Sequence, residues 1–351
     1  MGICAMSGSS LPQLLKLLAG LVLASGGCLA AETENANAAP RSAVHSDPVD
    51  HMADVAPAAS RSLLLDVARV GERLIAVGER GHVLLSADQG NSWIQAIGVP
   101  SRTMLTSLCF ADTGRGWAVG HDEIILSTRD HGRTWMRSHY APESQQPLLA
   151  VLCLDSQHVI AVGAYGSFFE TRDGGVNWQA RKFSYTRAAK PAATNADVPP
   201  DYHLNCIAAT EKYLFIGAES GQIFRSADSG ASWQQLPSPY KGSFFGLLPL
   251  NGDSLLVFGL RGNLFRTRDA GETWQKIETG ATAMLTDGAR LRDGTIVVVG
   301  LSGTVIASRD GGTSFKAFQQ ADRKGLSAVL ALDDGRILAV GESGPHIVDV
   351  R

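Results

Sequence analysis

The sequence lacks the short motifs that mark several common enzyme chemistries. It contains no His-Glu-x-x-His, no phosphate-binding glycine loop and no Cys-x-x-Cys, so no motif indicates a metalloprotease, a P-loop enzyme or a thiol redox enzyme. Charge is also sparse: 19% of the 351 residues are charged, and the formal net charge is -3. So small an excess exerts no overall attraction on nucleic acid or an anionic membrane. We expect no nucleic-acid partner, no cofactor, no resident metal and a monomer, with peripheral membrane association left open.

Cysteine is scarce as well, with five residues in the chain. Three of them, Cys109, Cys153 and Cys206, lie beyond the N-terminal segment. An odd number gives no complete disulfide framework. Each of the three stands within an apolar stretch, which favours buried thiols that act as small hydrophobic side chains.

One apolar run near the N-terminus, Leu17 to Ala24, follows Lys16 and precedes a string of small residues. Residues 1–30 therefore resemble a secretory signal peptide, and the run is too short to span a bilayer as a stable helix. We expect export to the periplasm. A lipid anchor at Cys28 is the weaker alternative, because Ser25-Gly26-Gly27 lacks the apolar residue usual three positions before such a cysteine.

What the chain does contain is one pattern, S/T-x-D-x-G-x-(T/S/N)-W/F, written six times. This pattern is an Asp box. The copies are Ser86–Trp93, Thr128–Trp135, Thr171–Trp178, Ser226–Trp233, Thr267–Trp274 and Ser308–Phe315. Short apolar runs rich in β-branched residues surround each copy, with turn residues between them, and this pattern is typical of strands. Several runs are apolar at consecutive positions, which predicts that neighbouring sheets cover both of their faces.

A glycine that ends the second run of each unit gives the period of the repeat. It stands at Gly78, Gly120, Gly163, Gly259, Gly300 and Gly341, with Ala218 in the fourth slot. Four strands per unit and a period near 41–43 residues indicate a β-propeller. We predict an all-β fold, a single propeller of seven four-stranded antiparallel blades over residues 61–351. The blades are expected at about 61–98, 102–139, 147–183, 203–236, 243–278, 284–318 and 326–351.

The seventh unit ends without an Asp box and is one strand short. Because an open ring leaves unpaired strand edges, we predict that a strand from about residues 48–58, within the leader 31–60, completes this blade. One interval of the repeat is longer, at 55 residues. It marks a Pro/Ala-rich insertion at 184–202, which predicts a loop. Whether this loop binds a partner or is merely tolerated length stays open.

The repeated aspartate could suggest a nucleophile or a calcium ligand, but a structural role explains six copies better. An Asp at a turn accepts hydrogen bonds from backbone amides just ahead of it, and the later Gly supplies unusual backbone angles. The aromatic residue is expected to fold under its own blade. The residues assigned this role are Asp88, Trp93, Asp130, Trp135, Asp173, Trp178, Asp228, Trp233, Asp269, Trp274, Asp310 and Phe315. The same register places Ser343 and His121-Asp122-Glu123 in turns, so we predict no catalytic residue and no metal ligand.

Because the boxes join the third and fourth strands, they all mark one face of the ring. The loops of the opposite face carry basic and aromatic residues of the kind that anchor protein interfaces. The candidate partner-binding residues are Arg61, Arg80, Arg102, Tyr202, His203, Tyr240, Lys241, Arg261, Arg323 and Lys324. We expect an acidic or carboxylate-ended segment of a membrane-complex protein as the ligand. An ordinary solvated rim is equally consistent with the sequence.

The boxes on strand-rich repeats resemble the bacterial-neuraminidase repeat proteins. A Val-Gly-x-x-Gly followed by a box, as in Val77–Gly81 before Asp88, together with Gly116–Gly120, is most similar to the photosystem II stability/assembly factor family. The resemblance covers about residues 61–351. It implies a non-catalytic, exported propeller that helps a newly made reaction-centre protein fold and assemble, and that holds its partner through an Arg-rich patch.

Two alternatives to this function stay open. The first is an accessory protein of another envelope complex, such as a transporter. The second is a glycoside hydrolase, sialidase-like or endoglucanase-like, because such enzymes share the box. The Arg-Ile-Pro element of sialidases is absent here, and the Asp-box endoglucanases, which use two acidic residues across a cleft, usually have two tandem propellers. We therefore expect no enzymatic activity.

Overall fold

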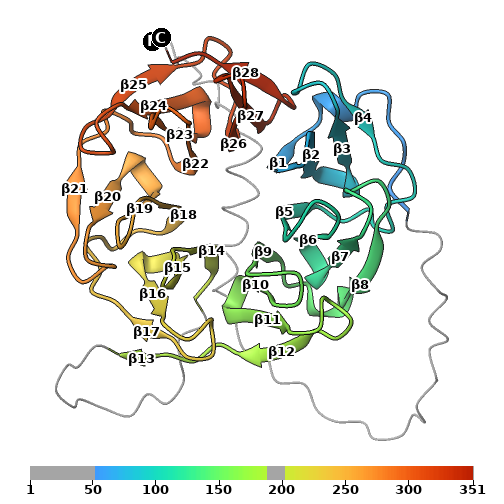
Figure 1. Ribbon diagram of the computed structural model, residues 1–351, viewed down its shortest axis with the longest axis horizontal. Coiled ribbons are helices and arrows are strands. Elements are labelled where there is room, and N and C mark those ends of the chain that lie inside the picture. Colours follow the sequence, from blue (N-terminus) through green and yellow to red (C-terminus); the bar gives the residue numbers. More distant parts are fainter. Residues whose placement is uncertain (1–51, 188–201, 351) are drawn as a thin grey trace, which may run out of the picture.

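A computed structural model describes residues 52–187 and 202–350. Their strands form seven sheets arranged around a central axis, with the first and last sheets side by side (Figure 1). The prediction of an all-β, seven-bladed propeller is confirmed. Helical structure in this part of the chain is limited to short 3-10 turns, and no helix there has the length and apolar character needed to cross a membrane.

Within each blade the strands follow one another from the inside of the ring outward. Blade 1 contains β1 (Leu64–Val70), β2 (Arg73–Gly78), β3 (Val83–Ser86) and β4 (Ile94–Gln95). Blade 2 contains β5 (Leu105–Phe110), β6 (Gly116–Gly120), β7 (Ile125–Thr128) and β8 (Met136–His139). Blade 3 contains β9 (Leu148–Cys153), β10 (Val159–Gly163), β11 (Ser167–Thr171) and β12 (Gln179–Lys182). Blade 4 contains β14 (Leu204–Ala209), β15 (Leu214–Ala218), β16 (Ile223–Ser226) and β17 (Gln234–Gln235), with β13 (Thr186–Arg187) added at its outer edge.

The remaining three blades continue the same order. Blade 5 contains β18 (Phe244–Pro249), β19 (Leu255–Gly259), β20 (Leu264–Thr267) and β21 (Gln275–Ile277). Blade 6 contains β22 (Leu285–Arg290), β23 (Ile296–Gly300), β24 (Thr304–Ser308) and β25 (Lys316–Gln319). Blade 7 contains β26 (Leu326–Ala331), β27 (Ile337–Gly341) and β28 (His346–Val348). All neighbouring strands pair antiparallel except β13 with β17, which pair in parallel.

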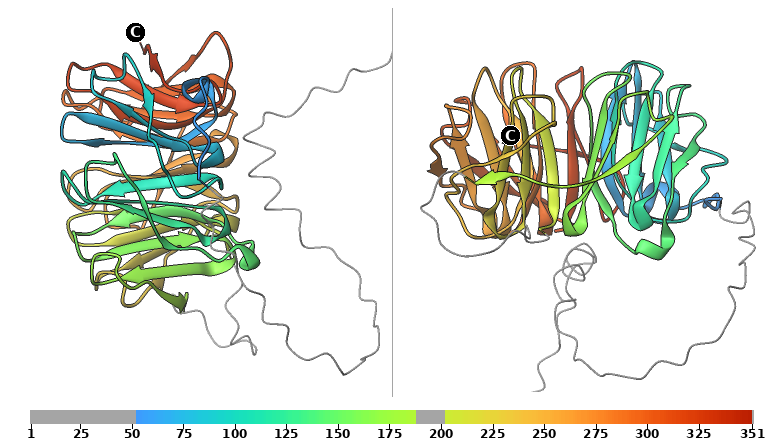
Figure 2. Two further views of the ribbon diagram at one scale, coloured as in Figure 1. Left: turned by 90° about the vertical axis from the view of Figure 1, so that its right-hand side faces the viewer. Right: turned by 90° about the horizontal axis from the view of Figure 1, so that it is seen from below.

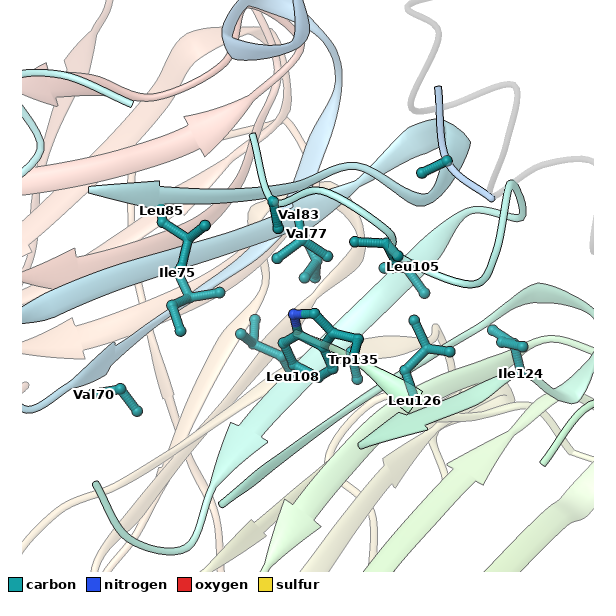
Figure 3. Packing of buried hydrophobic residues seen from close by; sticks show 14 residues of the cluster. Val70, Ile75, Val77, Val83, Leu85, Leu105, Leu108, Ile124, Leu126 and Trp135 are labelled. Atoms are coloured by element: carbon teal, nitrogen blue, oxygen red, sulfur yellow. The ribbon is translucent and has the colours of Figure 1, made fainter. Parts of the chain in front are cut away.

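The core lies between the blades. The second strands are the most deeply buried: every residue of β10 and of β19 is buried, because adjacent blades cover both faces. Between blades 1 and 2, Ile75 packs with Leu108 and Trp135 (Figure 3). Each side chain of this size contributes about 1.5–3 kcal/mol when fully buried. The consecutive apolar positions in the sequence thus predicted the covered faces correctly.

The aromatic residue of each box joins two blades. Trp135 belongs to blade 2 and packs in one cluster with Ile75 of blade 1. Trp93 of blade 1 packs against the cluster that contains Leu338 of blade 7. The expectation that this residue folds under its own blade is therefore incomplete, because it also fastens that blade to the preceding one.

Gly78, at the end of the second strand, is required by a close approach of two backbones. A Cβ atom at this position would lie 2.1 Å from the carbonyl oxygen of Leu63, just before the inner strand. At the glycines in the same slot of five other blades, a Cβ atom would lie 2.0–2.3 Å from the equivalent carbonyl oxygen. The repeated glycine, whose spacing predicted seven blades, therefore reflects the same close approach of two backbones in each of these blades.

Residues 52–58 do not complete the seventh blade. They form no strand and lie along blade 1, where the Ala53 amide donates to the Val99 carbonyl (2.8 Å) and the Ala56 amide to Gln95 Oε1 (2.9 Å). The predicted closing strand is wrong for these residues, while residues 48–51 lie outside the described part. The ring closes instead through side chains, since one apolar cluster contains residues of both blade 1 and blade 7.

Cys109 and Cys153 form a disulfide, with Cα atoms 5.8 Å apart. They lie near the ends of the inner strands β5 and β9, which the propeller repeat places side by side. The prediction of free buried thiols is wrong for this pair and correct for Cys206, which is free and buried. The signal segment 1–30, with Cys28, and residues 188–201 of the insertion lie outside the described residues.

Candidate functional site

Asp88 shows the hydrogen-bonding geometry of the boxes. Its Oδ1 accepts from the Ser92 amide (2.9 Å) and the Ser86 hydroxyl (2.8 Å), and its Oδ2 accepts from the Ser92 hydroxyl (2.5 Å). The Gly90 amide donates to Ser86 Oγ (2.9 Å). These hydrogen bonds, led by that from the Ser92 hydroxyl, lower the pKa of Asp88 to about 2. The ionised carboxylate is thus committed to its own turn.

The turns after the second strands lie on the face opposite the boxes, because the second and third strands of a blade run antiparallel. Edge-on views show the strands running between the two faces of the ring (Figure 2). The ten candidate residues all fall on this opposite face, because each stands in such a turn or in a loop that enters the next inner strand. The exposed ones are Arg61, Arg80, Arg102, Lys241, Arg261, Arg323 and Lys324. Tyr202 and Tyr240 are half-buried, and His203 is buried.

Four of these candidates come together where blades 3, 4 and 5 meet. The loop before β14 crosses the turn η6 (Ala164–Gly166), where the Gly166 amide donates to the Tyr202 carbonyl (2.9 Å). The exposed ring of Tyr165, in the same turn, meets the His203 ring edge-on at 4.6 Å between centroids. We call the group Tyr165, Tyr202, His203, Tyr240 and Lys241 the tyrosine mouth.

The other half of the tyrosine mouth is held by the turn η7 (Glu219–Gly221). The Glu219 amide donates to the His203 carbonyl (3.0 Å). The Tyr240 carbonyl approaches Gly221 so closely that a Cβ there would lie 1.9 Å from its oxygen. Gly221 also has a φ of +76°, so both this backbone angle and the lack of space for a Cβ favour glycine here. One turn therefore positions both loops that carry the mouth residues.

Burial favours the neutral form of two groups in the tyrosine mouth. Burial lowers the pKa of His203, although the carboxylate of Glu219, with its Oε2 3.6 Å from Nε2, acts in the opposite direction. Burial also raises the pKa of the Tyr202 phenol. The mouth thus offers ring surfaces and neutral hydrogen-bonding groups, and the exposed Lys241 stands in the loop that adjoins Gly221.

The start of the insertion borders the same surface. The Thr186 amide donates to the Trp233 carbonyl (2.9 Å), and the Tyr185 ring lies 4.7 Å from that of Phe224. Arg187 is exposed and close enough to Tyr202 for its charge to lower that phenol's pKa against the larger effect of burial. The predicted loop therefore contains a short added strand, β13, that places one more cation near the mouth.

Arg102 is already paired within the chain. Its guanidinium donates to the Met52 carbonyl (2.8 Å) and to Asp54 Oδ1 (2.8 Å). On β4 of blade 1, Gln95 Nε2 donates to the Asp54 carbonyl (2.8 Å). This arginine therefore fastens the described N-terminal residues to blade 1, and its side chain is 51% exposed.

The other predicted residues are distributed around the ring. Arg80 and Arg261 occupy left-handed positions in the turns of blades 1 and 5, with φ of 56° and 57°. Arg323 lies against Gly303 of blade 6, and Lys324 follows it, while Arg61 lies against Gly344 of blade 7. These residues thus lie on loops of blades 5, 6, 7 and 1, whereas the tyrosines, His203 and Lys241 lie where blades 3, 4 and 5 meet.

Sequence reasoning missed two kinds of residue. Tyr165 stands in the turn slot that Arg80 and Arg261 occupy in other blades, and this slot was the signal that could have found it. Asp66 and Asp287 were also missed, although each stands at the third position of an inner strand. Among the described residues, no three His, Cys, Asp or Glu side chains come together as metal ligands.

Comparison with known families finds a match over part of the chain. Residues 141–303 match the family model described as "Photosynthesis system II assembly factor YCF48". The predicted resemblance to the photosystem II assembly-factor family is confirmed over these residues, which include the whole tyrosine mouth. No curated protein matches the sequence significantly.

Solved propellers share the fold at low sequence identity. A structure of YCF48 bound to D1 peptide has a TM-score of 0.64 and 17% identity, over 83% of this chain and 95% of that one. YCF48 from Cyanidioschyzon merolae has a TM-score of 0.62 and 17% identity, over 84% and 96%. The WD40 β-propeller domain of Doa1 scores 0.59 at 14% identity, over 86% and 97%. Because such different proteins align equally well, these similarities establish the fold alone.

Proposed function

We propose that the chain is a non-catalytic propeller scaffold that binds a segment of a membrane-complex protein while that complex is assembled. The observation that carries the proposal is that the tyrosine mouth lies wholly within the residues matched by the photosystem II assembly-factor model. A solved relative in fold, YCF48, is described as bound to a D1 peptide. This supports a peptide ligand for the present chain.

The chemistry of the mouth favours an extended acidic segment. Tyrosine rings provide large contact areas with few rotatable bonds, and their hydroxyls give direction. Lys241 and Arg187 are exposed and form no ion pair among the described residues. A carboxylate side chain or a C-terminal carboxylate would supply the missing charge, and such charge-assisted contacts fix the register of a bound segment.

The test is to capture the partner in the native cell. A photo-reactive amino acid replaces Tyr165, whose side chain is 42% exposed, in the full-length chain, and the adducts are identified by mass spectrometry. The proposal predicts an adduct with a membrane-complex subunit. An adduct with a photosystem II protein would identify photosystem II as the complex, and an adduct with a transporter subunit would identify a transporter instead. An absence of membrane-protein adducts would contradict the proposal.

A matched control uses Arg133, which is exposed on the box face. The same photo-reactive amino acid at this position should give no adduct with the partner captured at Tyr165. Equal capture from both faces would show that the tyrosine mouth does not select the ligand. A panel of sialosides and β-glucans incubated with the purified protein tests the enzymatic alternative, and we expect no turnover.

We also propose that the chain is exported. The sequence of residues 1–30 supports this, and so does the disulfide between Cys109 and Cys153, because structural disulfides persist mainly in oxidising compartments. Cell fractionation with thiol alkylation before lysis tests the proposal. Recovery of the protein from the cytoplasm, with both cysteines alkylated, would contradict it.

A further inference from the structure

Blade 7 has an open place on its outer side. In the described residues the other six blades each have an outer strand that pairs antiparallel with the third, whereas the sheet of blade 7 is β26-β27-β28. The outer edge of β28 (His346–Val348) is therefore unpaired among these residues. Unpaired backbone groups at a sheet edge are a template for a further strand.

Among the described residues no box follows β28, and the contact between blades 6 and 7 differs from the other contacts between blades. At six interfaces a box aromatic packs against the preceding blade; these aromatics are Trp93, Trp135, Trp178, Trp233, Trp274 and Phe315. The box glycine accompanies it: a Cβ on Gly132 would lie 2.3 Å from Ile75, and one on Gly312 would lie 3.6 Å from Leu256. In blade 6 the equivalent second-strand residue is Val297, and its cluster contains no box aromatic among the described residues.

Two adjoining hollows mark this place. One, of about 580 Å³, is lined by Ala307, Lys316 and Phe318 of blade 6 and by Val350. The second, of about 370 Å³, is lined by residues that include Leu291, Ile347 and Val350. Both are bordered by Arg309. The walls combine apolar side chains with polar and charged ones, and Ile347 on the open strand is 42% exposed.

The hollows are lined by charges of both signs, and two of the cations are exposed. Arg309 and Lys316 are exposed and form no ion pair among the described residues, with the Lys316 ammonium 5.2 Å from the Phe318 ring centre. The carboxylates of Asp310 and Asp293, which also line the hollows, accept hydrogen bonds from amides of their own turns. Asp349 lines the second hollow and has an interaction of its own. The first hollow is lined by two cations and one carboxylate, so an acidic ligand matches its charge.

We propose that this place binds an extended, acidic segment of a partner protein, which adds as a fourth strand antiparallel to β28. An aromatic side chain of the segment would enter the hollow between blades 6 and 7, and a carboxylate would face Arg309 and Lys316. The described start of the chain does not serve this purpose, because residues 52–56 run along blade 1 and Ala53 lies in the core shared with blade 2. This site is separate from the tyrosine mouth.

The probe for this site is a synthetic peptide that copies residues 267–278, because this segment supplies the box, the Trp and the outer strand of blade 5. A photo-reactive amino acid replaces Ile347 in the full-length chain. The matched control places it at Ile94, which is 70% exposed on β4 of the complete blade 1. We expect a peptide adduct at position 347 and none at position 94.

Two further variants test the chemistry of recognition. A peptide with Trp274→Ala should bind roughly tenfold more weakly, as expected when a central aromatic anchor is truncated. The chain with Arg309→Glu and Lys316→Glu should also bind more weakly, with an unchanged melting temperature. The proposal is overturned by the absence of an adduct at position 347, by equal adducts at both positions, or by crosslinks to residues preceding Met52 or to a second copy.

Discussion

The carboxylate of Asp66 on β1 accepts a hydrogen bond of 2.8 Å from the Leu108 amide on β5. A side chain of blade 1 therefore satisfies a backbone amide at the inner edge of blade 2. Asp287 does the same for the Val329 amide of blade 7, also at 2.8 Å. Because inner-edge amides have no further strand to pair with, each carboxylate removes the cost of a buried, unpaired donor.

These two carboxylates predict how stability depends on pH. Burial raises the pKa of Asp66 to about 6, and burial together with the charge of Asp66 raises that of Asp287 to about 7, from 3.8. The folded protein thus binds these protons more tightly than the unfolded chain does. Their stabilising contribution is complete below about pH 4 and is lost as the pH rises through the two raised pKa values.

The measurement is the free energy of unfolding in urea between pH 4.5 and 8. We expect wild-type stability to decrease over this range and Asp287→Asn, which removes the charge with little change of shape, to reduce the decrease. The change Asp322→Asn, at an exposed carboxylate, serves as the control. Identical slopes for wild type and Asp287→Asn would contradict the assignment.

The box aromatics should dominate the stability of the ring. Trp135 is 4% exposed and packs between blades 1 and 2, so Trp135→Ala should reduce the free energy of unfolding by about 3–5 kcal/mol. Asp88→Ala should lower the melting temperature as well, because the turn loses its acceptors. Neither change should alter ligand binding at the tyrosine mouth. If Trp135→Ala unfolded at the wild-type melting temperature, the box aromatic would not stabilise the contact between the blades.

The disulfide should stabilise the contact between blades 2 and 3. It closes a loop of 44 residues, for which the expected stabilisation is about 2–4 kcal/mol. A reductant should therefore lower the melting temperature of the wild type but leave that of the variant with Cys109→Ser and Cys153→Ser unchanged. Equal responses of both proteins to the reductant would contradict this expectation.

Arg102→Ala should release the described N-terminal residues from blade 1. The guanidinium holds Met52 and Asp54, so its loss should increase hydrogen exchange at the amides of Ala53 and Ala56. Capture of the partner at the tyrosine mouth should be unaffected, since Arg102 is in another blade. Unchanged exchange, or loss of capture, would mean that this arginine has a different role.

The repeat made the fold predictable to a large extent. The glycine slot of Gly78 and the six boxes are fixed by local geometry, so the number of blades follows from their spacing along the chain. The disulfide could not be predicted in the same way, because Cys109 and Cys153 meet only when inner strands of successive blades lie side by side. The closing strand was expected from the general cost of open edges, yet packing between blades 7 and 1 closes the ring without it.

The site was only partly predictable for a similar reason. The repeat placed all ten candidate residues on one face, as the structure shows, and Tyr202, His203, Tyr240 and Lys241 were among them. Which of them gather depends on the turns η6 and η7, which the sequence does not place relative to one another. The pairing of Arg102 with Asp54 depends on the path of the N-terminal residues, which was predicted wrongly.

The most direct measurement of the central claim is a binding titration with the segment captured at Tyr165. The full-length wild type is compared with Lys241→Glu and with the control Arg133→Glu on the opposite face. The account predicts binding that is roughly tenfold weaker for Lys241→Glu, as for the loss of a charged contact with a carboxylate, and unchanged for Arg133→Glu, with equal melting temperatures. Equal affinity of all three proteins would contradict it.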